Sequence, residues 1–149
     1  CKWGSSNCDE ALADVHVASY SSSRRLSLEI DGYPKWHMKW LQTKGTIRLP
    51  VAASLDVDMG VGAIEIEGLA GDQRIDLGVG DVKIWANKAD VHSVAIDAGV
   101  GETKLHGVDR HVQEHRSMFV GSELYWSDGP GEAKIKIDVG VGEVSVWLE

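Results

Sequence analysis

The chain has 149 residues, of which 43% are hydrophobic and 26% charged, which fits one globular domain with a hydrophobic core. A formal net charge of −8 gives little attraction for nucleic acid or for an anionic lipid surface, because both require clustered lysine and arginine. The sequence has no run of about 18 apolar residues, so it predicts no segment that crosses a bilayer as a helix.

The first segment, 1–24, is rich in serine and is expected to cap or tether the domain that follows. Cys1 and Cys8 enclose a short polar loop, which predicts a disulfide in an oxidising compartment. Alternatively, Cys1 is the lipid-modified first residue of a bacterial lipoprotein and Cys8 is free, or both thiols are unpaired. Because the sequence starts at Cys1 and not at methionine, we expect an exported protein whose leader has been removed.

Three short segments after this cap alternate between apolar and polar residues, as strands with one buried face do. They are 26–30, 36–40 and 46–50. They begin the main predicted domain, 25–149, whose fold is indicated by the repeat that follows them.

A Gly-Val-Gly tripeptide recurs in the rest of the chain, with spacings of 18, 21 and 41 residues, the last being two periods of about 20. Apolar and polar residues alternate on both sides of each copy, so the tripeptide separates two short strands. Glycine suits such a corner because it reaches positive φ at low steric cost. The corner glycines are Gly60, Gly62, Gly78, Gly80, Gly99, Gly101, Gly140 and Gly142.

This pattern predicts an all-β, single-domain β-solenoid (β-helix) with coils of about 20 residues and Gly-Val-Gly corners. The valines between the glycines would form an interior column along the stack; they are Val61, Val79, Val100 and Val141. One coil lacks the tripeptide, and we expect a bulge or loop there, near Gly121.

The position five residues beyond the second glycine supports this register, because it is aromatic in most coils. Its residues are Glu67, Trp85, His106, Trp126 and Trp147. We expect them on the outer face, since neighbours such as Tyr125 are expected in the core. An exposed aromatic row suits a sugar face or a protein partner. We favour the alternative that the row stacks on itself or is covered by residues 1–43, because aromatic pairs on adjacent strands stabilise a sheet.

An acidic column beside the corner is a candidate calcium site. It contains Asp58, Asp76, Asp97 and Asp138. Neighbouring carboxylates about 4.8 Å apart repel one another, and a bound Ca²⁺ would relieve that repulsion. Solvated acids at exposed turns are the simpler interpretation, and we favour it.

His111 and His115 belong to an H-x-x-E-H sequence, the inverted zinc-protease pattern, and 109–116 is the segment with a helical pattern. The zinc chemistry needs a long helix and a third ligand, whereas this segment lies between predicted strands. A polar loop is therefore the favoured interpretation, and a surface metal site that includes His106 is a further alternative. We expect no cofactor.

Residues 44–149 resemble the bacterial "putative adhesin" β-strand-repeat family of unknown function, which is related to toastrack-like β-solenoid domains of envelope proteins. The resemblance rests on the glycine turns with their following strands, such as 63–69, and on Ile47-Arg48-Leu49-Pro50 and Leu55-Asp56-Val57. It implies a β-helix that is exported or attached to the envelope, with no catalytic residues to carry over.

We therefore expect a non-enzymatic structural or adhesion-type protein of the periplasm, the outer cell envelope or the extracellular space. Its repetitive surface would bind a protein, a surface polymer or other copies of the chain, and filaments could grow where the ends are weakly capped. An envelope sensory or regulatory module that binds a membrane protein is the alternative. A metal-dependent hydrolase is less favoured, because the H-x-x-E-H segment offers neither a long helix nor a third ligand. The sequence also has no Ser-His-Asp order, P-loop or dinucleotide motif.

Overall fold

The computed structural model describes residues 16–21, 26–31, 44–108, 112–116 and 121–149. The chain divides into two compact units, 1–47 and 48–149. In the first unit, β1 (His16–Ser21) and β2 (Leu26–Asp31) form an antiparallel pair. The predicted strand at 26–30 is therefore confirmed, whereas the one predicted at 36–40 lies outside the described residues.

The second unit is all-β, with no helix in its described part. Its strands are β3 (Leu55–Glu67), β4 (Gln73–Ala86), β5 (Val91–His106), β6 (Val112–Arg116), β7 (Ser122–Ser127) and β8 (Ala133–Leu148). They form one mixed sheet in the order β3-β4-β8-β5-β7-β6. The pairs among β3, β4, β8 and β5 are parallel, and β7 pairs antiparallel with both β5 and β6.

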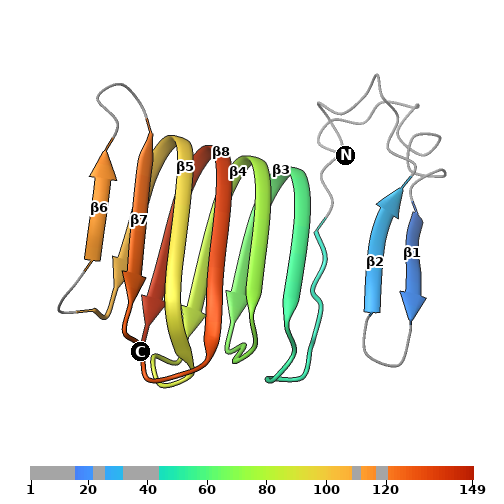
Figure 1. The fold of residues 1–149 in the computed structure, drawn as a ribbon. Helices are drawn as coiled ribbons and strands as arrows, with labels where there is room; N and C mark the ends of the chain where they lie inside the picture. The colour runs from blue at the N-terminus through green and yellow to red at the C-terminus, as the bar shows by residue number, and fades with distance from the viewer. Residues whose placement is uncertain (1–15, 22–25, 32–43, 109–111, 117–120) are drawn as a thin grey trace. The chain divides into compact units, whose positions relative to one another are not determined.

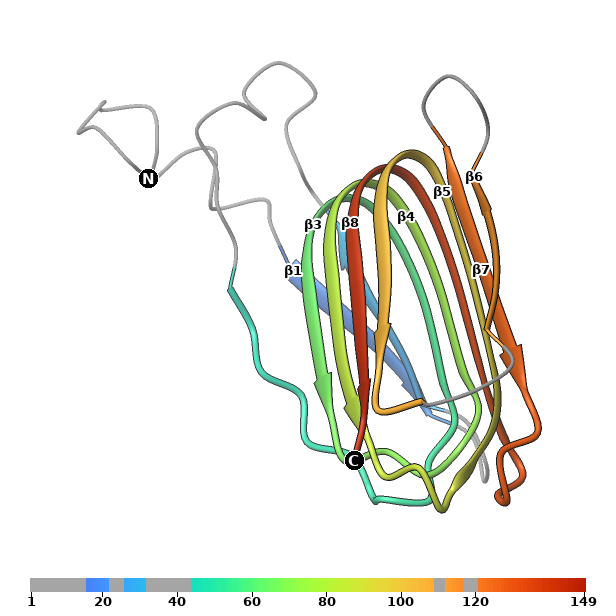
Figure 2. The same cartoon turned by 90° about the vertical axis from the view of Figure 1, so that its left-hand side faces the viewer.

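Each of the four long strands bends at its Gly-Val-Gly tripeptide, so that its two halves lie in two layers (Figures 1 and 2). We call these the first-half layer and the second-half layer. β7 pairs with the part of β5 that precedes the tripeptide, so β7 and β6 extend the first-half layer. The predicted corners thus coincide with the bends, although each half belongs to one continuous strand.

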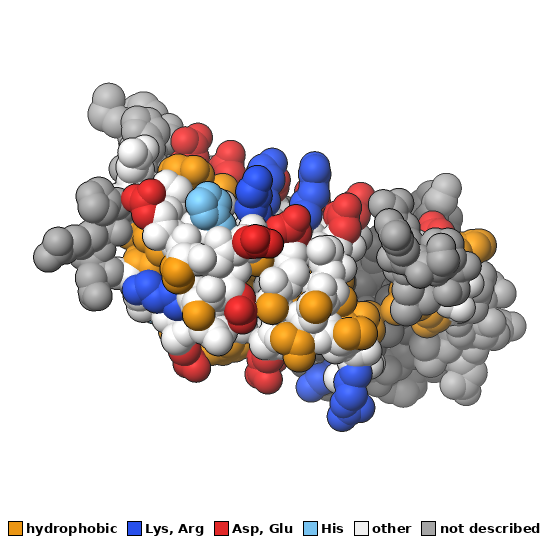
Figure 3. Space-filling model, turned by 60° about the horizontal axis from the view of Figure 1, so that its bottom comes forward, with side chains coloured by type: hydrophobic (Ala, Val, Ile, Leu, Met, Phe, Trp, Pro, Cys, Tyr) orange, Lys and Arg blue, Asp and Glu red, His pale blue; other side chains and the backbone are white. Residues whose placement is uncertain are grey.

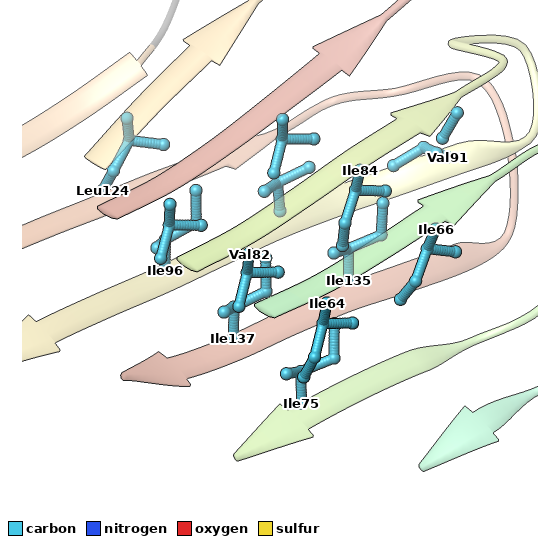
Figure 4. Close-up of a cluster of buried hydrophobic side chains, with 14 of the residues drawn as sticks. Ile64, Ile66, Ile75, Val82, Ile84, Val91, Ile96, Leu124, Ile135 and Ile137 are labelled. Carbon is cyan, nitrogen blue, oxygen red and sulfur yellow. The ribbon is translucent and has the colours of Figure 1, made fainter. Parts of the chain in front are cut away.

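The core lies between the two layers. Ile75 and Ile137 come from first halves and Val82 and Ile84 from second halves, and their side chains point toward one another (Figure 4). All four are fully buried. The apolar residues of each half recur at every second position, which is why the sequence pattern predicted these strands.

The order of the strands differs from a stack built in chain order, because β8 is inserted between β4 and β5. The reversal of β7 explains this. β7 runs antiparallel to β5, so it ends near the start of β5, where the turn before β8 is bonded: Gly129 donates its amide proton to the carbonyl of His92, and Ala133 donates to that of Asp90. From there the chain enters β8 on the other side of β5.

Two predicted segments have a different structure. Residues 46–50, expected as a strand, form none, and Ile47 is 62% exposed. Residues 112–116, in the segment with a helical pattern for which a polar loop was favoured, form β6, whose backbone pairs with β7. Residues 112–116 form a strand because β7 is available as a pairing partner, and a five-residue segment gains more stability from an adjacent strand than from one helical turn.

A buried polar pair joins the layers at β7. The hydroxyl oxygens of Thr103 in β5 and Ser122 in β7 are 2.7 Å apart, and both residues are buried. Each hydroxyl satisfies the other where an apolar residue would otherwise be expected. This bond holds β7 against the second half of β5.

Gln73 is the polar side chain that is least well satisfied in the described core. It is 1% exposed; its amide nitrogen donates to the carbonyl of Leu69 at 3.4 Å, and its Oε1 has no partner. We expect Gln73→Met, which keeps the volume, to raise the free energy of unfolding by about 1 kcal/mol, because an unpaired buried carbonyl is costly. Urea denaturation measures this. Gln113→Met on the exposed side of β6 is the control, and a lower stability for Gln73→Met would show that the amide is needed.

Candidate functional site

The aromatic row of the second-half layer runs along adjacent strands. Trp85 pairs in register with Glu67 on one side and Trp147 on the other, and Trp147 pairs with His106. The Trp85 and Trp147 ring centroids are 4.8 Å apart with planes 6° apart, and those of His106 and Trp147 are 5.2 Å apart with planes 10° apart. The in-register spacing of the strands therefore produces a stack of three rings.

This stack limits what the row can bind. Trp147 has one ring face against Trp85 and the other against His106, so its faces are occupied and its edge is what remains available. A sugar packs on an exposed ring face. The geometry therefore supports the self-stacking interpretation of these three residues over a sugar-binding platform.

Trp126 does not belong to this row, which corrects the sequence prediction. It lies in β7, pairs with Val94 and is 4% exposed, whereas the neighbouring Tyr125 is 47% exposed. The prediction assumed a parallel coil in register with the others. β7 is antiparallel, and a shift of one residue exchanges the faces of a strand.

Charged residues next to the aromatic row form a small network on the same face. Nζ of Lys104 is 2.7 Å from Oε1 of Glu143 and 3.0 Å from a carboxylate oxygen of Glu102. The hydrogen bond that Lys104 donates to Glu143, followed by the one that it donates to Glu102, raises the pKa of Lys104, and the bond that Glu143 accepts from Lys104 lowers the pKa of Glu143.

The signs of these shifts set the pH range of the network. The contribution of Glu143 is present above its unfolded pKa and is lost as the pH falls through its lower folded pKa. That of Lys104 is present below its unfolded pKa and is lost as the pH rises through its higher folded pKa. The pair therefore persists through neutral pH, and because both side chains are exposed to solvent its effect on stability is small.

The acidic column exists as predicted. Asp58, Asp76, Asp138 and Asp97 are consecutive along it, followed by Glu123. Asp138 is 2.9 Å from Nζ of Lys136 on its own strand. Around the rim of the second unit, acidic and basic side chains are interspersed when it is seen from the end opposite the bends (Figure 3).

The candidate metal ligands are not brought together. Within the described ranges, no three His, Cys, Asp or Glu side chains are grouped as a metal ion requires. His115 lies on β6, in register with Glu123, so residues 112–115 of the zinc-protease pattern are not helical. His111, Cys1 and Cys8 lie outside the described residues, and the disulfide stays a prediction.

The valines between the glycines form an exposed ridge, which corrects the predicted interior column. They are consecutive across the sheet in the order Val61, Val79, Val141 and Val100, with exposures of 71%, 46%, 46% and 40%. We call this row the corner ridge. In β4 the buried positions are two residues apart up to Leu77, and the next buried position is Val82, five residues later. The bend therefore interrupts the alternation and turns Val79 outward.

The ridge is bordered by acidic residues on both sides. The four aspartates of the acidic column lie three positions before each valine. Asp81, Glu143 and Glu102 lie two positions after three of the valines, with Ala63 at the fourth. The sequence reasoning identified the carboxylates but missed the ridge. The signal for it was the switch between odd and even inward positions across each tripeptide, which runs from odd to even in β3, β4 and β8 and from even to odd in β5.

The comparisons with known proteins are limited. The described residues contain no helix long and apolar enough to cross a membrane. No family model and no curated protein matches the chain. Among solved structures, the chain is similar to a "putative cell adhesion protein" from Clostridium sporogenes ATCC 15579, with a TM-score of 0.43 and 13% identity, over 91% of this chain and 77% of that one.

Proposed function

We propose that the chain is a non-catalytic structural or adhesion-type module exported to the cell envelope. In this proposal its bent parallel strands act as a β-solenoid that presents repetitive rows of side chains to a protein, to a surface polymer or to other copies. The proposal that the chain is exported rests on Cys1 and Cys8, because these two residues could form a disulfide in an oxidising compartment.

The register of the four long strands is the observation that supports this proposal. Asp58, Asp76, Asp138 and Asp97 share one row, and the valines of the corner ridge share another. A surface on which one side-chain type recurs at the spacing of the strands suits a repetitive or multivalent partner. Among the described residues, by contrast, no three candidate metal ligands are grouped into a site.

Bead adhesion tests this function. The full chain is coupled to beads of two colours, which are mixed with each other and separately with insoluble peptidoglycan and cellulose. We expect mixed-colour clusters or retention on a polymer, saturable and blocked by free chain. Gly60→Ala should behave as the wild type, whereas Gly80→Ala, which disturbs the register, should lose the effect.

Two results would overturn the proposal. One is the absence of both clustering and retention in the folded wild-type chain. The other is a zinc-dependent peptide hydrolysis that Glu114→Gln abolishes, since this would assign the chemistry of the H-x-x-E-H pattern to the chain.

A further inference from the structure

The corner ridge is an apolar surface that the fold itself does not require. Its valines occupy the outer side of each bend, where polar residues would be equally compatible with the backbone. All four positions nevertheless carry valine. Side-by-side packing of β-branched residues accounts for part of this choice. Exposures from 40% to 71% show that such packing leaves much of the row uncovered.

The charges beside the ridge indicate the chemistry of a partner. Asp138 is paired with Lys136, and Glu102 and Glu143 share Lys104. For Asp58, Asp76 and Asp97, no ion pair occurs within the described residues. On one flank of the ridge, three of the four carboxylates therefore have no cationic partner there, which suits lysine or arginine on a partner.

The spacing of the ridge favours a helix over a strand as the partner. The valines follow the separation of the strands, about 4.8 Å, and the row spans about 14 Å. An α-helix presents a residue of one face once per turn, about every 5.4 Å, so roughly three turns match the row. Same-face residues of a strand are about 6.6 Å apart and lose the match within two steps.

We propose that the corner ridge binds an amphipathic α-helix of a partner protein whose apolar stripe is bordered by lysine or arginine. The apolar stripe lies along the valines, and the basic residues face the row of Asp58, Asp76 and Asp97. This inference rests on the proposed function, for which it names the surface and the class of partner.

The test uses two synthetic peptides of identical leucine and lysine composition. One has its leucines at helical spacing, and the other has them at alternating positions. Binding to the full chain is measured by fluorescence anisotropy at low and high salt. We expect the helical-spacing peptide to bind at least tenfold more tightly, and its affinity to fall as salt screens the carboxylates.

The variants separate the apolar from the electrostatic contribution. Replacing the four ridge valines by threonine keeps their shape and strand preference while removing apolar surface, and should weaken binding at least tenfold. Asp58→Asn, Asp76→Asn and Asp97→Asn together keep the valines and should remove most of the salt dependence. Ile47→Thr with Val51→Thr, at other exposed apolar residues, should change nothing.

Three results would overturn the inference: equal affinity for the two peptides, unchanged binding by the threonine variant, or self-association of the wild type that the threonine variant abolishes. The last would make a second copy the occupant of the ridge. If peptide selectivity fails while beads still cluster or bind polymer, the inference falls and the proposed function stands. If the chain binds the helical-spacing peptide selectively but shows no bead adhesion, the inference stands and the proposed function falls.

Discussion

Gly80→Ala is expected to lower the free energy of unfolding of the second unit by about 2–4 kcal/mol. Gly80 has φ of 141°, in a region that residues with a Cβ rarely adopt. A Cβ there would also overlap the carbonyl oxygen of Gly62 on the adjacent strand. Because β3 and β4 pair in parallel through this corner, the backbone could relieve the overlap only by giving up ladder hydrogen bonds.

Gly60→Ala is the matched control for this prediction. Gly60 is the first glycine of its tripeptide, whereas Gly80 is the second glycine of its own. A Cβ at Gly60 meets no atom within 4 Å. Its substitution should cost less than about 1 kcal/mol. Guanidinium denaturation of both variants measures the difference, and similar midpoints would show that the second glycine is not required at the bend.

The same geometry distinguishes the predicted corner glycines from one another. The second glycine has positive φ at Gly80, Gly101 and Gly142, and at each of them a Cβ would overlap a neighbouring carbonyl. Gly62 and the first glycines lack positive φ, although a Cβ at Gly78, Gly99 or Gly140 would also come too close to a neighbouring carbonyl oxygen. The repeat predicts that a corner is present, but only the neighbouring strand decides which glycine has no room for a side chain.

The period of the repeat predicted the strands and their parallel register well. The row of Asp58, Asp76, Asp97 and Asp138 was read from spacing alone and is confirmed. Its order was not predictable, because identical repeats can pair with one another in any order. The insertion of β8 depends on where β7 ends, and β7 lies in the coil whose repeat has degenerated.

The corner ridge shows a second limit of pattern reading. Counted forward from Leu77, Val79 falls on the inward face, whereas counted back from Val82 it falls on the outward face. Alternation holds only while the backbone is extended, and the bend adds a step that the pattern does not reveal. The exposure of the residues at the bend therefore could not be read from the sequence pattern and was found in the structure. These residues form the proposed docking surface.

Trp126→Ala is expected to lower the free energy of unfolding by about 3–5 kcal/mol, the cost of removing a large aromatic from a core. Trp126 is 4% exposed, and its ring lies next to Gly129, in the turn that leads into β8. Its loss should therefore weaken the turn as well as the core. Tyr125→Ala, at a side chain that is 47% exposed, should cost less than about 1 kcal/mol.

This pair of variants also tests the face assignment of β7. Thermal denaturation and the tryptophan emission that Trp126→Ala removes from the wild-type spectrum are the two measurements, because a buried indole emits at shorter wavelength than an exposed one. A larger loss for Tyr125→Ala than for Trp126→Ala would contradict this face assignment and would place Trp126 on the outer face of β7.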